Sequence, residues 1–137
     1  MKKVFVSAAI AASFSFSIST PDMRIGSNEW KAPPEADKLI NPLKGNAAAT
    51  SEGKKIFTLM CAMCHGEKGK GDGAAGLLLH PRPANYTLPK TQEQSDGVLF
   101  WKMSEGRTPM ASYKTALTET QRWQLVNYLR TFNPDKK

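Results

Sequence analysis

Apolar residues recur with a helical period in three segments of the chain. In the first, residues 46–63, an alanine-rich start favours helix. Ile56, Phe57 and Met60 follow at spacings of three and four residues, so they share one helical face. No segment of useful length alternates between apolar and polar residues, as a half-buried strand would. The pattern therefore predicts an all-α domain.

The two other helical segments lie in the second half of the chain. One covers about residues 95–105, and Gly106 is expected to end it. The other begins after Thr118, whose spacing to Gln121 fits a capping box, and it ends before Pro134. Its broad apolar face consists of Trp123, Leu125, Val126, Tyr128, Leu129 and Phe132. This last helix is the clearest in the sequence.

The chain before residue 46 has a different composition. Lys2 and Lys3, an apolar and serine-rich run, and then small residues predict a secretory signal peptide over residues 1–19. The run is short for a membrane span, which needs about twenty mostly apolar residues, although an uncleaved anchor stays an alternative. Residues 20–45 contain four prolines among polar residues and are expected to form an extended arm or linker. The domain itself is then expected over residues 46–137.

Residues 61–65 read Cys-Ala-Met-Cys-His and hold the only two cysteines of the chain. This is the pattern of c-type haem attachment. Thiols about one helical turn apart can each add to one haem vinyl group, and the imidazole that follows can bind the iron. The motif predicts one covalent haem c, attached through Cys61 and Cys64, with His65 as an iron ligand.

Three other interpretations of this pentapeptide compete with haem. A thioredoxin-like dithiol needs a βαβ context, which the flanking sequence lacks. A zinc site would add His80 as a fourth ligand, but the fourteen residues between His65 and His80 do not fit the usual histidine spacing. A disulfide could form in an oxidising compartment, yet it leaves His65 unexplained.

A glycine-rich segment follows the pentapeptide. Five glycines stand among charged residues between positions 66 and 76. Such a segment does not hold a regular element, and it lets the backbone pass closely around a flat cofactor. Its Gly-x-Gly-x-Gly run is a weak match to a nucleotide-binding loop, because no strand precedes it.

A second axial ligand must come from elsewhere in the chain. Met110 follows Pro109 in an irregular stretch between the second and third expected helices, where proline can aim the thioether at the iron. Met103 lies on the apolar side of a helix and is better explained as core filler. His80 is the rival, but its loop would more naturally pass along the side of His65. We therefore expect His65 and Met110 as the iron ligands.

With these features the chain resembles a class I, mitochondrial-type cytochrome c of the bacterial monohaem kind. The resemblance covers about residues 46–132 and is carried by Gly53, Phe57, the pentapeptide, Gly66 with the glycine-rich segment, Pro109-Met110 and residues 123–129. It implies a small cytochrome c fold, in which three main helices and loops surround one haem. It also implies that the first and last helices cross where Gly53 meets Tyr128, and that Pro81 or Pro83 lies beside the His65 ring.

The expected ligand set also indicates what the protein does. With His65 and Met110 both bound, the iron has no open coordination position, so we expect a one-electron carrier and no catalytic residues. Methionine ligation raises the reduction potential. Two alternatives stay open: an electron-transfer subunit of a larger oxidoreductase, held through residues 20–45, and a haem peroxidase or gas sensor in which Met110 is labile.

Charge and the export signal indicate the partners and the compartment. Removing Lys2 and Lys3 from a chain of net charge +7 leaves +5. The lysines of the domain could form a basic surface that steers the carrier to an acidic redox protein, although ordinary solvated lysines explain them equally well. Nucleic acid is not expected, because no basic run is interleaved with stacking aromatics. We expect a periplasmic monomer without a membrane span in its mature form, docking transiently on redox proteins.

Overall fold

The structure is a computed structural model that describes residues 29–136. The chain divides into two compact units, Met1–Trp30 and Lys31–Lys137, of which the second carries the fold. The expected signal peptide over residues 1–19 lies outside the described residues, so it stays a prediction.

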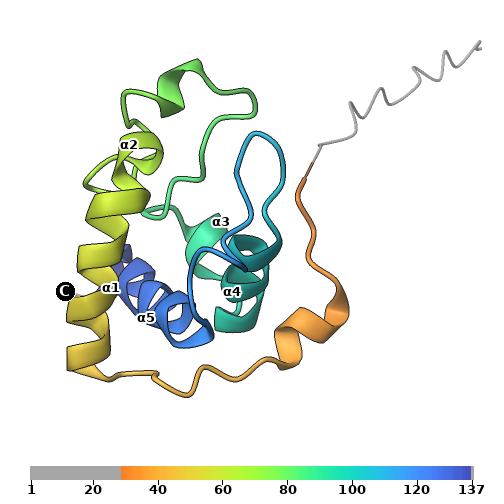
Figure 1. The fold of residues 1–137 in the computed structure, drawn as a ribbon, viewed down its shortest axis with the longest axis vertical. Helices are drawn as coiled ribbons and strands as arrows, with labels where there is room; N and C mark the ends of the chain where they lie inside the picture. Colours follow the sequence, from red (N-terminus) through yellow and green to blue (C-terminus); the bar gives the residue numbers. More distant parts are fainter. Residues whose placement is uncertain (1–28, 137) are drawn as a thin grey trace, which may run out of the picture. The chain divides into compact units, whose positions relative to one another are not determined.

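The unit from Lys31 onward is helical, and the described residues contain no strand. Its α-helices are α1 (Ala47–Met60), α2 (Ala62–His65), α3 (Pro89–Gln92), α4 (Asp96–Glu105) and α5 (Glu119–Leu129). Short 3-10 helices are η1 (Pro34–Lys38), η2 (Gly76–Leu78), η3 (Arg130–Phe132) and η4 (Pro134–Lys136). The prediction of an all-α domain is confirmed, with α1, α4 and α5 as its main helices (Figure 1).

Side chains cap the N-termini of all three main helices. Asn46 accepts a hydrogen bond from an amide of the first turn of α1 at 2.9 Å, and Ser95 does the same for α4 at 3.1 Å. Thr118 and Gln121 form the predicted capping box at the start of α5. Each cap satisfies an amide that the helix itself leaves unpaired. At the other end of α4, Gly106 adopts a positive φ of 68°, a conformation that favours glycine.

α1 and α5 cross each other in close contact (Figure 1). The nearest atoms to Gly53 belong to the backbone of Gln124 and Leu125, and a Cβ at this position would overlap the Gln124 carbonyl. The helices therefore approach each other because Gly53 has no side chain. Tyr128, the expected partner of Gly53, packs against Phe57, which lies on the same helix α1 as Gly53, with ring centroids 5.3 Å apart.

The hydrophobic core lies between these helices. It consists of Phe57, Tyr86, Leu99, Met103, Leu117, Trp123, Leu125, Val126 and Leu129. Trp123 also stacks on Phe100, with ring centroids 3.9 Å apart. Met103 is buried among these residues, as expected for a residue that fills the core.

Residues 31–45 belong to the compact unit, so the expectation of an extended arm up to residue 45 is wrong for this part. η1 begins with a proline, which is tolerated in the first turn of a helix. Ala36 in η1 is 1% exposed, and a Cβ on Gly97 of α4 would overlap its carbonyl oxygen. The domain therefore begins at Lys31 and not at residue 46.

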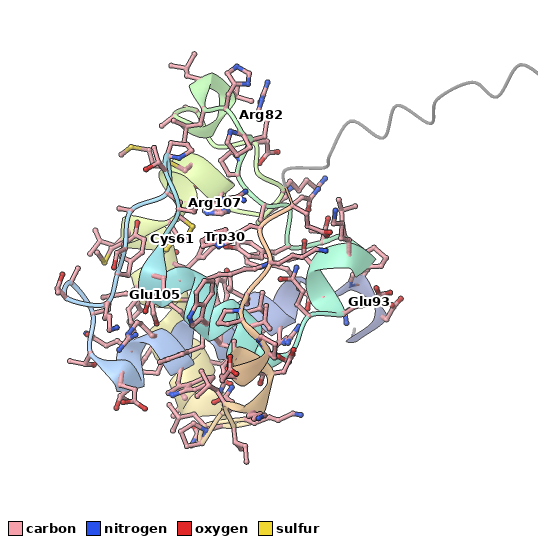
Figure 2. All side chains as sticks on the ribbon, turned by 90° about the vertical axis from the view of Figure 1, so that its right-hand side faces the viewer. Trp30, Cys61, Arg82, Glu93, Glu105 and Arg107 are labelled. Atoms are coloured by element: carbon pink, nitrogen blue, oxygen red, sulfur yellow. The ribbon has the colours of Figure 1, made fainter. Side chains whose placement is uncertain are left out.

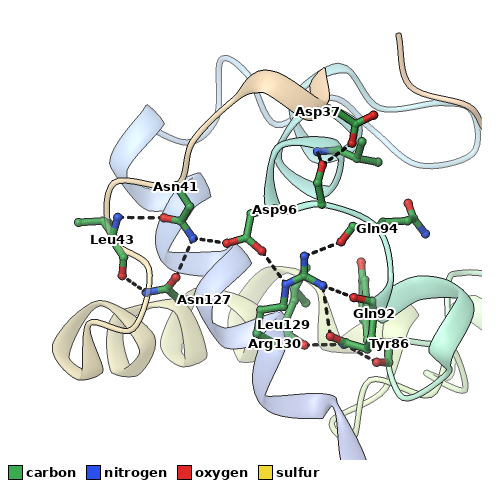
Figure 3. Close-up of polar contacts among 12 residues, drawn as sticks. Asp37, Asn41, Leu43, Tyr86, Gln92, Gln94, Asp96, Asn127, Leu129 and Arg130 are labelled. Atoms are coloured by element: carbon green, nitrogen blue, oxygen red, sulfur yellow. Dashed lines mark hydrogen bonds and ion pairs between the residues drawn. The ribbon is translucent and has the colours of Figure 1, made fainter. Parts of the chain in front are cut away.

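A polar network fastens this segment to α4 and to the end of α5 (Figure 3). The side-chain amide of Asn41 donates to Asp96 at 3.0 Å and to Asn127 at 2.8 Å. Arg130 donates to the other carboxylate oxygen of Asp96 at 2.7 Å. Burial by itself would raise the pKa of Asp96, but the hydrogen bonds from Asn41 and Arg130 and the Arg130 charge hold that pKa below its usual value.

Candidate functional site

The pentapeptide forms a turn of its own at the end of α1. The amide of Cys61 donates to the Phe57 carbonyl at 2.9 Å, which completes α1. α2 then starts, and the His65 amide donates to the Cys61 carbonyl at 2.8 Å. The helix expected over residues 46–63 is thus interrupted at Cys61. Both cysteines are partly exposed, and they form no disulfide with each other.

The glycine-rich segment folds back over the pentapeptide. Its backbone amides donate hydrogen bonds to successive carbonyls of the pentapeptide in reverse order. Gly71 donates to His65 at 2.8 Å, Gly73 to Cys64 at 3.2 Å, and Ala75 to Met63 at 3.1 Å. A Cβ at Gly73 or Gly76 would overlap these carbonyl groups. The backbone can approach so closely only because these residues lack side chains.

The imidazole of His65 is buried and held in one orientation. His65 is 7% exposed, its Nδ1 lies 3.1 Å from the carbonyl oxygen of Ala84, and Tyr86 stacks on the ring at 4.9 Å between centroids. Burial lowers the pKa of His65, which favours the neutral ring. Because a carbonyl can only accept, Nδ1 carries the proton and Nε2 keeps its lone pair. Metal-binding histidines commonly have this second hydrogen bond.

The surroundings of the sulfur atoms bear on the other interpretations of the motif. Burial, with a smaller contribution from Cys64, raises the pKa of Cys61 to about 12. A redox-active dithiol needs a lowered pKa, so this environment does not suit thioredoxin-like chemistry. Residues 29–136 contain no group of three or more His, Cys, Asp or Glu side chains arranged to hold a metal ion. The structure therefore does not bring His80 into a zinc site with the pentapeptide.

Two thiols without a disulfide and a neutral, oriented imidazole suit covalent haem. Cys61 and Cys64 would provide the thioether bonds, and His65 would offer Nε2 to the iron. His80 is exposed on the loop between η2 and α3, the loop that also holds Ala84. Figure 2 labels Arg82 in this loop and Cys61 at the end of α1.

Ala84 and Tyr86 hold His65 in place, and the expected position of Pro81 or Pro83 beside the ring stays a prediction. Ala84, the residue after Pro83, supplies the carbonyl, whereas Pro83 packs against Gly71 and Gly76. Sequence reasoning missed both Ala84 and Tyr86. A backbone acceptor leaves no side-chain signal, and the stacking of Tyr86 depends on the course of the loop.

Met110 lies half-buried in the loop between α4 and α5. We call residues 106–113 the methionine loop; Figure 1 shows it extending from α4 in the same direction as the pentapeptide end of α1. The backbones of Arg107 and Met110 form two hydrogen bonds that close a tight turn. The Met110 amide donates to the Arg107 carbonyl at 2.8 Å, and the Arg107 amide donates to the Met110 carbonyl at 3.0 Å. The described contacts do not join Met110 to His65, so its role as a ligand stays a prediction.

Tyr113 connects the methionine loop with the pentapeptide. Its hydroxyl lies 3.5 Å from the carbonyl oxygen of Met60, the residue before Cys61. Burial raises the pKa of Tyr113, and Cys61 and Cys64 add smaller contributions. The loop that carries Met110 is thus attached beside the cysteines.

Comparisons with known proteins agree with this geometry. The family model described as Cytochrome c matches residues 50–133. Among solved structures, a chain of the reducing HAO-like protein complex of Kuenenia stuttgartiensis is 32% identical with a TM-score of 0.52, covering 60% of this chain and 41% of that chain. The present chain thus spans less than half the length of that neighbour. No curated protein matched.

The described residues also hold no helix with the length and apolar character to span a bilayer. The helical fold, the pentapeptide and the family match over most of the domain lead to one assignment. This chain belongs to the cytochrome c family, carries covalent haem c, and is a haem electron-transfer protein.

Proposed function

We propose that the chain is an exported monohaem carrier that passes single electrons between redox partners, with thioether bonds at Cys61 and Cys64 and with His65 and Met110 as axial ligands. When bound, the haem supplies an iron that accepts one electron from a donor and gives it to an acceptor. The protein makes and breaks no covalent bond during this transfer; it holds the ligands and excludes water.

The orientation of His65 is the observation that carries this proposal. The hydrogen bond to Ala84 and the stacking of Tyr86 fix the ring on two sides. A ring held in this way presents Nε2 in one direction and needs little rearrangement when the charge at the iron changes. Such rigidity suits a site that only exchanges electrons.

The position of Met110 supports its role as the second ligand. The methionine loop is attached beside the cysteines through Tyr113. His80, the rival, lies exposed on the loop that supports His65, which is the side already used by the first ligand. Ligation by both His65 and Met110 leaves no place for a substrate, which favours electron transfer over enzymatic catalysis.

Export and docking follow from the sequence and the surface. Thioether attachment in bacteria takes place outside the cytoplasmic membrane, and residues 1–19 have the pattern of a signal peptide, so we propose a periplasmic protein. Met63, within the pentapeptide, is 70% exposed, and Lys68 and Lys70 are exposed in the segment that follows. An apolar contact with basic neighbours suits a small, short-lived complex with an acidic redox partner.

Optical spectra of the ferric holo-protein test the ligand assignment. We expect a low-spin spectrum in wild type, with the weak red absorption band of an iron–methionine bond, and loss of that band in Met110→Ala. The matched variant His80→Ala should keep the wild-type spectrum. A band that survives in Met110→Ala would refute the assignment. A wild-type spectrum that is low-spin but lacks the band, and that changes to high-spin only in His80→Ala, would transfer the role to His80.

A fixed subunit of a larger oxidoreductase is a second candidate function. It is favoured by the similarity to a chain of the Kuenenia stuttgartiensis complex. Because residues 31–45 belong to the compact domain, an arm that attaches such a subunit would be limited to the segment before Lys31. Sedimentation of the natively purified protein distinguishes the two: a free monomer would exclude the fixed subunit.

A further inference from the structure

The last turn of α4 holds both ends of the methionine loop. The loop leaves the helix at Gly106, where α4 ends. It returns to the same turn, because the hydroxyl of Ser112 donates to the Ser104 carbonyl at 2.6 Å and the amide of Tyr113 donates to the Met103 carbonyl at 3.1 Å. The methionine is thus carried by a short loop that is closed by hydrogen bonds to one helix end.

Ser104, to which Ser112 is bonded, is itself fixed. It is 3% exposed, and its hydroxyl donates to the Phe100 carbonyl at 2.7 Å. The same hydroxyl accepts a hydrogen bond from Nη1 of Arg122 on α5. A side chain with both its donor and its acceptor in use has little freedom to move.

Arg122 is an unusual residue for this position. It is 8% exposed, and its guanidinium lies 4.7 Å from the centre of the Phe100 ring. Its Nε has no hydrogen-bond partner within the described part of the chain. Burying a cation without a carboxylate partner is costly. Its hydrogen bond to the Ser104 hydroxyl places the guanidinium beside the last turn of α4, where a positive charge is favourable.

We propose that Ser112 is a positioning residue for Met110, and that Arg122, acting through Ser104, stiffens the helix end to which Ser112 is bonded. The inference rests on the proposed role of Met110 as an axial ligand. Removing the Ser112 hydroxyl breaks its hydrogen bond to Ser104 and loosens the C-terminal end of the methionine loop. The Met110 thioether then leaves its ligand position more often. The rest of the fold stays folded during this movement, because α4 and α5 do not depend on Ser112.

Imidazole binding to the ferric holo-protein measures this movement, since added imidazole can take the position only when the methionine has left it. We expect Ser112→Ala to bind imidazole about fivefold more tightly than wild type, the effect of losing one hydrogen bond. Ser104→Ala, which cuts the connection to Arg122, should change the affinity in the same direction. Ser112→Thr keeps a hydroxyl and should restore the wild-type value.

Thr115→Ala is the matched control, because it removes another exposed hydroxyl just after the methionine loop. An imidazole affinity of Ser112→Ala equal to that of wild type would overturn the inference, even if denaturant unfolding showed a less stable fold. An equal rise in Ser112→Ala and Thr115→Ala would also contradict it. If Met110→Ala keeps the wild-type spectrum, the ligand assignment itself fails and this inference fails with it.

Discussion

The carbonyl oxygen of Ala84 accepts a hydrogen bond from Nδ1 of His65 at 3.1 Å. This contact joins the loop between η2 and α3 to the pentapeptide and determines which ring nitrogen carries the proton and which keeps its lone pair. Because the acceptor belongs to the backbone, the identity of residue 84 matters less than the course of the loop. The loop is in turn held by Tyr86, whose amide donates to the Gly69 carbonyl at 2.7 Å.

Tyr86→Ala should destabilise the holo-protein by about 3–5 kcal/mol, the range for removing a large buried aromatic side chain. The ring is lost from the core and from the face of His65 together. Denaturant unfolding followed by circular dichroism measures the change. Tyr86→Phe keeps the ring and serves as the control; an equal loss in both variants would show that the hydroxyl, and not the stacked ring, is responsible.

Gly53→Ala should destabilise the fold by about 1–3 kcal/mol, as overpacking of a close contact does. Alanine is the better helix former by about 1 kcal/mol, so the sign depends on the clash with the Gln124 carbonyl. Thermal unfolding is the measurement, with the exposed Ser51→Ala on the same helix as the control. Unchanged or increased stability of Gly53→Ala would mean that α1 and α5 do not cross as closely as described.

Asp96→Asn should cost about 2 kcal/mol at neutral pH, where the carboxylate accepts charged hydrogen bonds. Since the folded pKa of Asp96 lies below its ordinary value, its stabilising effect is complete above the unfolded pKa of about 3.9. The effect is lost as the pH falls through the lower folded pKa. Stability of the variant should therefore depend less on pH in the acidic range than that of wild type.

Glu52→Gln provides the comparison for this prediction. Glu52 pairs with Lys55 at 2.7 Å, but both side chains are exposed, and such pairs contribute at most about 1 kcal/mol. Urea unfolding at a series of pH values measures both variants. A pH profile of Asp96→Asn that parallels wild type would contradict the assigned role of the carboxylate.

The double variant Cys61→Ala and Cys64→Ala should contain no covalent haem, because both thioether bonds are lost. Mass spectrometry of the denatured polypeptide gives the answer directly, since covalently attached haem adds its mass to the chain. Each single variant can keep one bond. Met63→Ala, at the exposed position between the cysteines, should retain the full mass, and haem retained by the double variant would disprove attachment at these residues.

The sequence predicted best those features that depend on interactions between residues close together in the chain. The capping box of Thr118 and Gln121 and the stop of α4 at Gly106 involve groups a few positions apart. The Cys-x-x-Cys-His spacing likewise lies within a single turn. Local hydrogen bonds and periodicity are sufficient for such features, and α4 and α5 therefore begin and end close to their expected positions.

The features that the sequence missed depend on partners far away in the chain. Asn41 is buried only because it meets Asp96 and Asn127, and nothing near residue 41 indicates those contacts. The prolines before Asn41 led to the prediction of an extended arm over residues 20–45. A proline can, however, also begin a helical turn, as Pro34 does in η1. The burial of Arg122 on α5 likewise depends on Ser104 and Phe100 of α4, which nothing near residue 122 indicates.

The packing of η1 on α4 determines where this protein can be shortened. A fragment beginning at Ala47 would lack Ala36 and Asn41, which would uncover the backbone of Gly97 and remove one donor from Asp96. Such a fragment should express poorly or aggregate, since it exposes a surface that normally lies in the interior. Recombinant work on the isolated domain should therefore start no later than Lys31.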